Sequence, residues 1–193
     1  MEESAARKLR FLALQVVGAV AAIHFVVGAA ELLRFAAGGL LGEYLTGGQA
    51  LSQPEPLLFT LSALALLGGV VAVGVGRLDH RRAYLLGAGL MGTYIVGWLA
   101  WHSVLSHGLG EAASGGPSHL GLVDVVASHY ADPMVRLFAG ADQPGRTTLA
   151  VVSKTLEAVA LALLGTLLFA DPWAARADPE TPVAGMTDDT TRE

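Results

Sequence analysis

A few ionisable side chains lie inside stretches that are otherwise apolar, and these are the residues best placed to do chemistry. His24 and Glu31 are seven residues apart in the first apolar stretch, and Lys154 and Glu157 are three apart in the last. In an α-helix these spacings put both members of each pair on one face. His102 lies near the end of the third stretch. Because an ionisable group in a bilayer costs about 2.5–3.5 kcal/mol to insert, each needs a partner or a function.

The elements that must position these side chains are transmembrane helices. Of the 193 residues, 53% are apolar and 15% are charged, and the mean hydropathy is +0.53. Soluble domains carry about 25% charged residues. Four apolar stretches reach the roughly 20 residues that cross a bilayer. The predicted fold class is therefore an all-α integral membrane protein, a four-transmembrane-helix bundle with spans at about 11–35, 57–76, 83–104 and 147–170.

The segments that flank and connect these spans are polar or rich in helix breakers. Residues 1–10 form a predicted amino-terminal segment, and residues 11–170 form the transmembrane domain. The long third connection, over 105–146, contains apolar runs that predict short amphipathic helices on the membrane surface. Repeated Pro, Asp, Thr and Glu over 171–193 predict a disordered tail.

The orientation in the membrane follows from the positions of Lys and Arg in the short loops. The amino-terminal segment and the turn over 77–82 carry three basic residues each, whereas the first long loop has none after Arg34. We therefore expect a multi-pass protein of the cell membrane with both termini cytoplasmic. Trp98 and Trp101 fit an aromatic belt at the opposite, outer interface.

With this orientation, the charged faces of the first and last spans share the outer half of the bilayer. The first span runs outward and the last runs inward, so their polar residues meet at a similar depth. We expect contact between Glu31 and Lys154, or between Glu157 and His24. The predicted polar pocket is formed by His24, Glu31, His102, Lys154 and Glu157.

A purely structural interpretation of the same residues stays open. Lys154 and Arg34 could extend to the outer headgroups, and Lys154 could pair locally with Glu157. Small residues at four-residue spacing predict close packing of spans two and three, although such stripes also serve homo-oligomers. The stripes are Gly68, Ala72 and Gly76 in span two, and Gly89, Thr93 and Gly97 in span three.

Metal and cofactor chemistry are less well supported by the residue pattern. The sequence has no cysteine, no G-x-S-x-G motif and no His-x-x-x-His pair. We therefore predict no defined metal site and name no catalytic residue. Haem usually requires two histidines at similar depth, but His24 is central and His102 is near the edge. A quinone or haem remains an alternative. The candidate ligands of an outer metal site, if one exists, are His102, His107, His119 and His129.

The layout of the chain resembles the DoxX-like family of small four-helix membrane proteins. The local likenesses are LLGGVV at Leu66–Val71, the GLMG run at Gly89–Gly92 followed by His102, and the basic turn Arg77–Arg82. The resemblance implies a membrane subunit associated with quinone-linked oxidation or oxidative-stress complexes. It carries over no catalytic residue.

Three functions are consistent with these observations. The first is an accessory subunit of a membrane redox or respiratory-type complex, beside a larger membrane or peripheral redox protein and not an enzyme by itself. The second is a small transporter or proton-linked permease that uses the polar pocket. The third is a haem- or quinone-binding membrane protein. The partners expected are the lipid bilayer and a second copy of the chain, and the absence of a basic cluster argues against nucleic acid.

Overall fold

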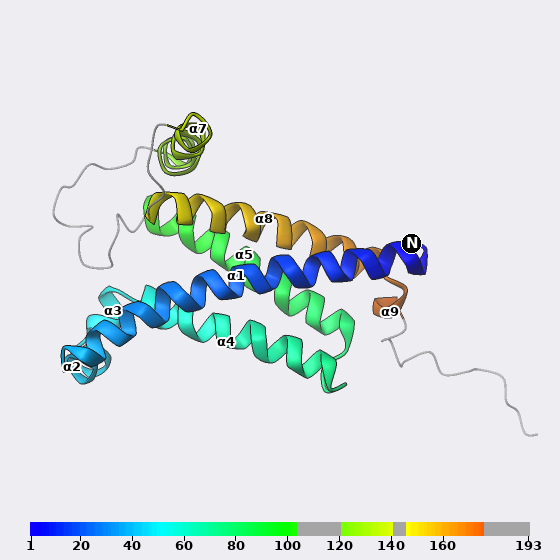
Figure 1. Ribbon diagram of the computed structural model, residues 1–193, viewed down its shortest axis with the longest axis horizontal. Helices are drawn as coiled ribbons and strands as arrows, with labels where there is room; N and C mark the ends of the chain where they lie inside the picture. Colours follow the sequence, from blue (N-terminus) through cyan, green and yellow to red (C-terminus); the bar gives the residue numbers. More distant parts are fainter. Residues whose placement is uncertain (104–120, 141–145, 176–193) are drawn as a thin grey trace, which may run out of the picture.

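The computed structural model describes residues 1–103, 121–140 and 146–175, which include four long helices packed together (Figure 1). These are α1 (Glu3–Ala37), α4 (Glu55–Gly74), α5 (His80–Ser103) and α8 (Arg146–Ala170). All four are long and apolar enough to cross a membrane. The predicted fold class is confirmed.

The ends of the long helices follow from local sequence chemistry. α1 begins at Glu3, well before residue 11, because a first-turn carboxylate and good helix formers continue the helix into the polar segment. α4 begins beside Pro56, which needs no hydrogen-bond acceptor in a first turn. After α1 and α4, Gly39 and Gly76 adopt φ of 70° and 71°, a conformation that favours glycine.

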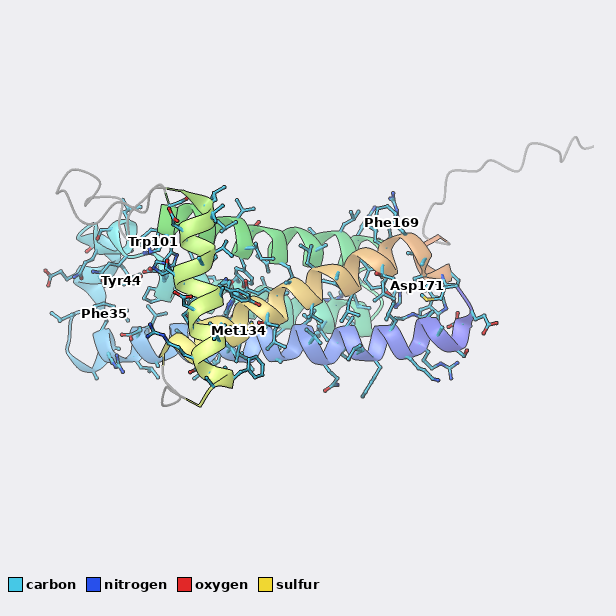
Figure 2. The ribbon with its side chains drawn as sticks, turned by 90° about the horizontal axis from the view of Figure 1, so that it is seen from above. Phe35, Tyr44, Trp101, Met134, Phe169 and Asp171 are labelled. Carbon is cyan, nitrogen blue, oxygen red and sulfur yellow. The ribbon has the colours of Figure 1, made fainter. Side chains whose placement is uncertain are left out.

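Short helices occur in two of the connections, although they were predicted only for the third. The first connection contains α2 (Leu41–Thr46) and α3 (Gln49–Ser52). The third contains α6 (Leu122–Val126), a π-helical turn η1 (Ala127–Ala131) and α7 (Asp132–Phe138). Figure 2 shows that this last segment, which carries Met134, lies across the ends of α5 and α8 farthest from the amino terminus. Residues 104–120 and 141–145, which are the last residue of the predicted third span and much of the predicted third loop, lie outside the described residues.

The bundle has two distinct ends. The start of α1, the α4–α5 turn and the short helix α9 (Pro172–Ala175) lie at one end, here called the proximal end (Figure 1). Helices α2, α3 and α7 lie at the other, the distal end. The structure differs from the predicted tail at its first residues, because Asp171 is buried and α9 is helical. Residues 176–193 lie outside the described residues. That the proximal end is cytoplasmic stays a prediction.

The helices do not pair as the glycine stripes predicted. α1 packs most extensively on α4, and α5 packs on α8. α1 and α4 approach closely at Gly28, where an added Cβ would lie 2.7 Å from the Pro56 carbonyl oxygen of α4. A Cβ at Gly68, Gly76, Gly89 or Gly97 would have no described atom within 4 Å. The prediction that these stripes close the α4–α5 hairpin is therefore wrong, and the stripes face outward.

The outer surface of the bundle is apolar. Large side chains with more than half of their area exposed occur on all four long helices, among them Leu33, Leu58, Leu86 and Phe169. In water such a surface would be an aggregation liability, whereas lipid tails solvate it. The inside holds the buried polar groups His24, Ser153, Glu157 and Asp171. This distribution is that of a membrane-embedded protein in contact with the lipid bilayer.

Candidate functional site

His24 of α1 and Glu157 of α8 are in contact inside the bundle. This contact is one of the two alternatives that the sequence predicted. The His24 Nε2 atom lies 3.1 Å from Glu157 Oε1 and 3.1 Å from the Ser153 hydroxyl. The residues are 3% and 0% exposed. At 1.5 Å per residue, Glu157 is roughly 15–20 Å of helix from either end of α8. His24 is roughly 20 Å from the end of α1 at Ala37 and roughly 30 Å from its start at Glu3.

Lys154 completes the group. Its Nζ donates to Glu157 Oε2 at 2.5 Å and to the main-chain oxygen of Tyr94 at 3.4 Å. The first contact is the local pair of the structural interpretation, and the second ties α8 to α5. His24, Ser153, Lys154 and Glu157 are called the buried polar centre below.

Aromatic side chains enclose the imidazole. Phe59 of α4 stacks on His24 with ring centroids 4.7 Å apart, and Tyr94 of α5 meets it edge-on at 4.2 Å. All four long helices therefore contribute to the surroundings of this one ring. The close α1–α4 contact at Gly28, one turn after His24, holds the stacked pair in place.

The hydrogen bonds around His24 determine which ring nitrogen carries the proton. The Ser153 hydroxyl donates to Glu157 Oε1 at 2.9 Å, so its oxygen presents a lone pair to the imidazole. The Glu157 carboxylate also presents only acceptors. Because Nε2 faces two acceptors, we assign its proton there. The Nδ1 atom of the neutral ring is then a bare base, and it has no hydrogen-bond partner among the described residues.

Two of the five predicted pocket residues lie elsewhere. The half-buried Glu31 accepts a hydrogen bond from Arg34 at 2.8 Å, and Lys154 bonds Glu157 and Tyr94, so the alternative contact between Glu31 and Lys154 is not formed. His102 Nδ1 bonds the main-chain oxygen of Trp98 at 2.9 Å. The structure thus brings together His24, Lys154 and Glu157 of the predicted set.

Of the four histidines predicted on the outer side, the structure describes two, and these two are in contact. The His102 and His129 rings lie 4.7 Å apart, edge to face. His107 and His119 lie outside the described residues. Within the described ranges no group of three or more His, Asp or Glu side chains could hold a metal ion. Binding of a quinone or haem stays a prediction.

A second polar network at the proximal end was not anticipated from the sequence. The buried Asp171 carboxylate accepts from Arg10 Nε at 2.9 Å, from the Tyr84 hydroxyl at 2.6 Å and from the Trp173 amide at 2.9 Å. It joins α1, α5 and the end of α8, and is called the proximal clasp. Burial by itself would raise the pKa of Asp171, but the bonds from Arg10, Tyr84 and Trp173 outweigh it and hold the pKa below its ordinary value.

The fold and the buried polar centre define a small multi-pass membrane protein with ionisable groups closed inside its bundle. Comparison of the chain with protein-family models, with curated proteins and with solved structures finds no match. Its function therefore has to be inferred from the buried polar centre and from the surfaces around it.

Proposed function

We propose that this protein is a small proton-linked permease whose buried polar centre binds and releases the proton. The observation that carries the proposal is the Nδ1 atom of a nearly fully buried His24, which has no hydrogen-bond partner within the described part of the chain, beside the fully buried Glu157. If the centre served packing alone, apolar side chains would stabilise the fold at least as well, because the desolvation free energy of a buried ion pair often exceeds its electrostatic gain. Intramembrane ionisable groups of this kind commonly mark proton pathways.

The geometry gives each group a role in proton binding. Glu157 and Ser153 hold the Nε2–H and so aim Nδ1 away from the carboxylate. A proton that enters the centre adds to the Nδ1 lone pair, and the imidazolium formed is stabilised by Glu157. Lys154 neutralises that carboxylate while the ring is uncharged. His24 is thus the proton carrier, and Glu157 is its positioning and charge-stabilising partner.

Protonation changes the contact between two helices. A neutral His24 on α1 donates a hydrogen bond to the charged Glu157 on α8, whereas the imidazolium forms an ion pair with it. The α1–α8 contact is then tighter with the proton bound and looser after release. In this structure the centre is closed, so access requires movement of the helices. Four helices are few for alternating access, which favours a working dimer.

Proton flux in reconstituted vesicles tests the proposal. Vesicles carry an internal pH-sensitive dye, and a potassium gradient with valinomycin imposes a negative interior potential. We expect wild-type protein to acidify the interior faster than protein-free vesicles do, and Glu157→Gln to return the rate to that background. Glu31→Gln is the matched control, because Glu31 pairs with the exposed Arg34 and takes no part in the buried polar centre, and it should retain wild-type flux. Equal rates in wild-type and Glu157→Gln vesicles would overturn the proposal.

The accessory-subunit hypothesis is supported by a different feature, the outward-facing glycines of α4 and α5. Gly68, Gly89 and Gly97 leave open faces on which the helices of a larger membrane partner can pack closely. Kinship with the DoxX-like family stays a prediction alongside it. Affinity purification in mild detergent should then recover a stoichiometric partner chain. Recovery of the protein alone, at every detergent concentration tested, would remove this second candidate.

A further inference from the structure

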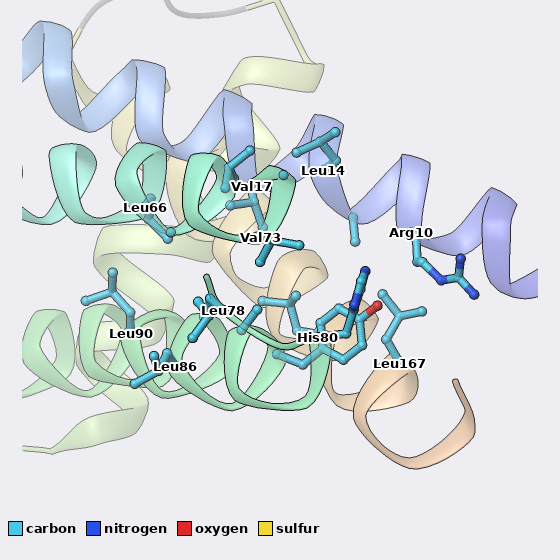
Figure 3. A pocket seen from close by; sticks show the side chains of 18 of the residues that line it. Arg10, Leu14, Val17, Leu66, Val73, Leu78, His80, Leu86, Leu90 and Leu167 are labelled. Atoms are coloured by element: carbon cyan, nitrogen blue, oxygen red, sulfur yellow. The ribbon is translucent and has the colours of Figure 1, made fainter. Parts of the chain in front are cut away.

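An apolar cavity of about 640 Å³ lies in the proximal half of the bundle, apart from the buried polar centre. Figure 3 shows side chains from all four long helices around it. Its apolar lining includes Leu14, Val17, Leu66, Val73, Leu90 and Leu167. The volume falls within the roughly 300–1,000 Å³ of typical small-ligand sites.

The cavity exists because α4 and α5 pack on different partners and separate from each other. Gly69 and Gly74 on α4 and Gly87 on α5 line it and contribute no side chain. Two further lining residues, Val70 of α4 and Leu86 of α5, are 39% and 65% exposed. The cavity is therefore a groove that opens sideways, between α4 and α5, onto the lipid-facing surface.

The proximal end of the groove is polar and basic. Arg10, His80 and Tyr84 line it. The bonds of Arg10 to Asp171 and Glu3 use its Nε and Nη2 atoms, and the described bonds leave Nη1 without an acceptor. Arg77 and Arg81 flank the lining residues of the α4–α5 turn, and both are exposed.

The physics of the bilayer determines what this groove can select. An empty apolar groove forfeits dispersion contacts, so something fills it. An acyl chain that moves in from the bilayer gains little from the hydrophobic effect, because lipid tails are as apolar as leucine. Any preference among lipids must therefore come from the polar end, where Arg10 Nη1 and the exposed Arg77 and Arg81 favour an anionic headgroup.

We propose that the groove binds one acyl chain of an anionic phospholipid, with the headgroup phosphate held at the Arg10, Arg77 and Arg81 end. This site is independent of the proton-binding centre. It predicts that a lipid of the leaflet at the proximal end stays with the protein after detergent extraction. Each basic residue near the phosphate should contribute roughly fivefold to the preference for an anionic over a zwitterionic headgroup.

The test is a lipid titration of the full-length protein in mild detergent, read by mass spectrometry under non-denaturing conditions. Dioleoyl phosphatidylglycerol and dioleoyl phosphatidylcholine share the same chains and differ in headgroup charge. We expect one phosphatidylglycerol to bind at least roughly fivefold more tightly than phosphatidylcholine. Arg77→Gln should reduce that ratio by roughly fivefold, and Arg34→Gln at the distal end should leave it unchanged.

Two adjacent glycines, Gly68 and Gly69, provide a matched pair of variants that tests whether the groove binds the acyl chain. A Cβ at Gly68 or at Gly69 has no described atom within 4 Å, so both accept leucine, yet only Gly69 lines the groove. Gly69→Leu should abolish retention of the lipid and Gly68→Leu should preserve it. Equal binding of the two lipids by the wild-type protein would overturn the proposal without any variant. The proposal would also be overturned if a second copy of the protein filled the groove, which would be seen as a dimer that Gly69→Leu dissociates.

Discussion

The Nε2 atom of His24 lies 3.1 Å from Oε1 of Glu157, and this contact joins α1 to α8 near the middle of the bundle. It places a titratable ring from one end of the chain against a carboxylate from the other, with Glu157 fully buried. Lys154 pairs with the other oxygen of the same carboxylate, Oε2. Stability and the proposed proton binding therefore depend on the same residues, and variants can separate them.

The charge balance of the buried polar centre predicts opposite effects for single and double substitutions. Glu157→Leu leaves Lys154 without its ion partner, and we expect it to lower the free energy of unfolding by about 3–5 kcal/mol. Replacing Lys154 by Met in the same chain removes that penalty and should restore stability to within about 1 kcal/mol of wild type. Unfolding in mild detergent measures both. A double variant no more stable than the single one would show that charge balance is not what Glu157 contributes.

The proximal clasp predicts unequal roles for the two carboxylates that contact Arg10. Asp171→Asn removes a buried carboxylate charge that accepts hydrogen bonds from three residues, and it should lower the free energy of unfolding by about 3 kcal/mol. Glu3→Gln removes an exposed partner of the same arginine and should cost less than about 1 kcal/mol. The comparison is made by thermal unfolding of both variants in one detergent, and equal losses would contradict burial as the cause.

Asp171 also predicts how stability depends on pH. Its pKa is lower in the folded protein than in the unfolded chain, so its contribution to stability is complete above the unfolded value of about 3.9. That contribution is lost as the pH falls through the folded pKa, because protonation breaks the charged bonds to Arg10. We expect the melting temperature to fall on acidification below about pH 4, with a shallower fall in Asp171→Asn. Parallel curves for the two proteins would assign the acid loss to other groups.

Two glycines of α1 provide a test of the α1–α4 contact. A Cβ at Gly28 would lie 2.7 Å from the Pro56 oxygen and 2.8 Å from the Thr60 nitrogen, both main-chain atoms that cannot move aside. Gly28→Ala should therefore cost about 1–3 kcal/mol through overpacking. Gly18→Ala has open space and should be neutral or stabilising by up to about 1 kcal/mol. Unfolding measurements that rank the two variants in the reverse order would contradict the packing described.

The sequence alone predicted the four spans, and the reason is physical. Bilayer thickness requires about 20 apolar residues whatever the helices pack against, so length and hydropathy suffice. The same constraint made His24, Lys154 and Glu157 stand out, because charged groups are rare at that depth. Their spacing on helix faces correctly predicted that His24 and Glu157 meet.

Contacts between distant helices could not be predicted in the same way. Ser153 and Tyr94 are ordinary residues of membrane helices, and only the α1–α8 and α5–α8 packing makes them neighbours of His24 and Lys154. Asp171 looked like the first residue of a polar tail, although it pairs with an arginine 161 positions earlier. Glycine spacing indicated close helix packing but not the partner, which is why Gly28 was missed and the α4–α5 stripes were misassigned.

The most direct test of the account is the ¹⁵N magnetic resonance spectrum of histidine-labelled protein in lipid bilayers, with His24→Gln used to assign the ring. We expect a neutral His24 ring with its proton on Nε2 and a bare Nδ1, because Nε2 faces the Ser153 and Glu157 acceptors. Glu157→Gln should weaken this preference for Nε2. A neutral ring with its proton on Nδ1 in the wild-type protein would contradict the proposed role of His24 as the proton carrier.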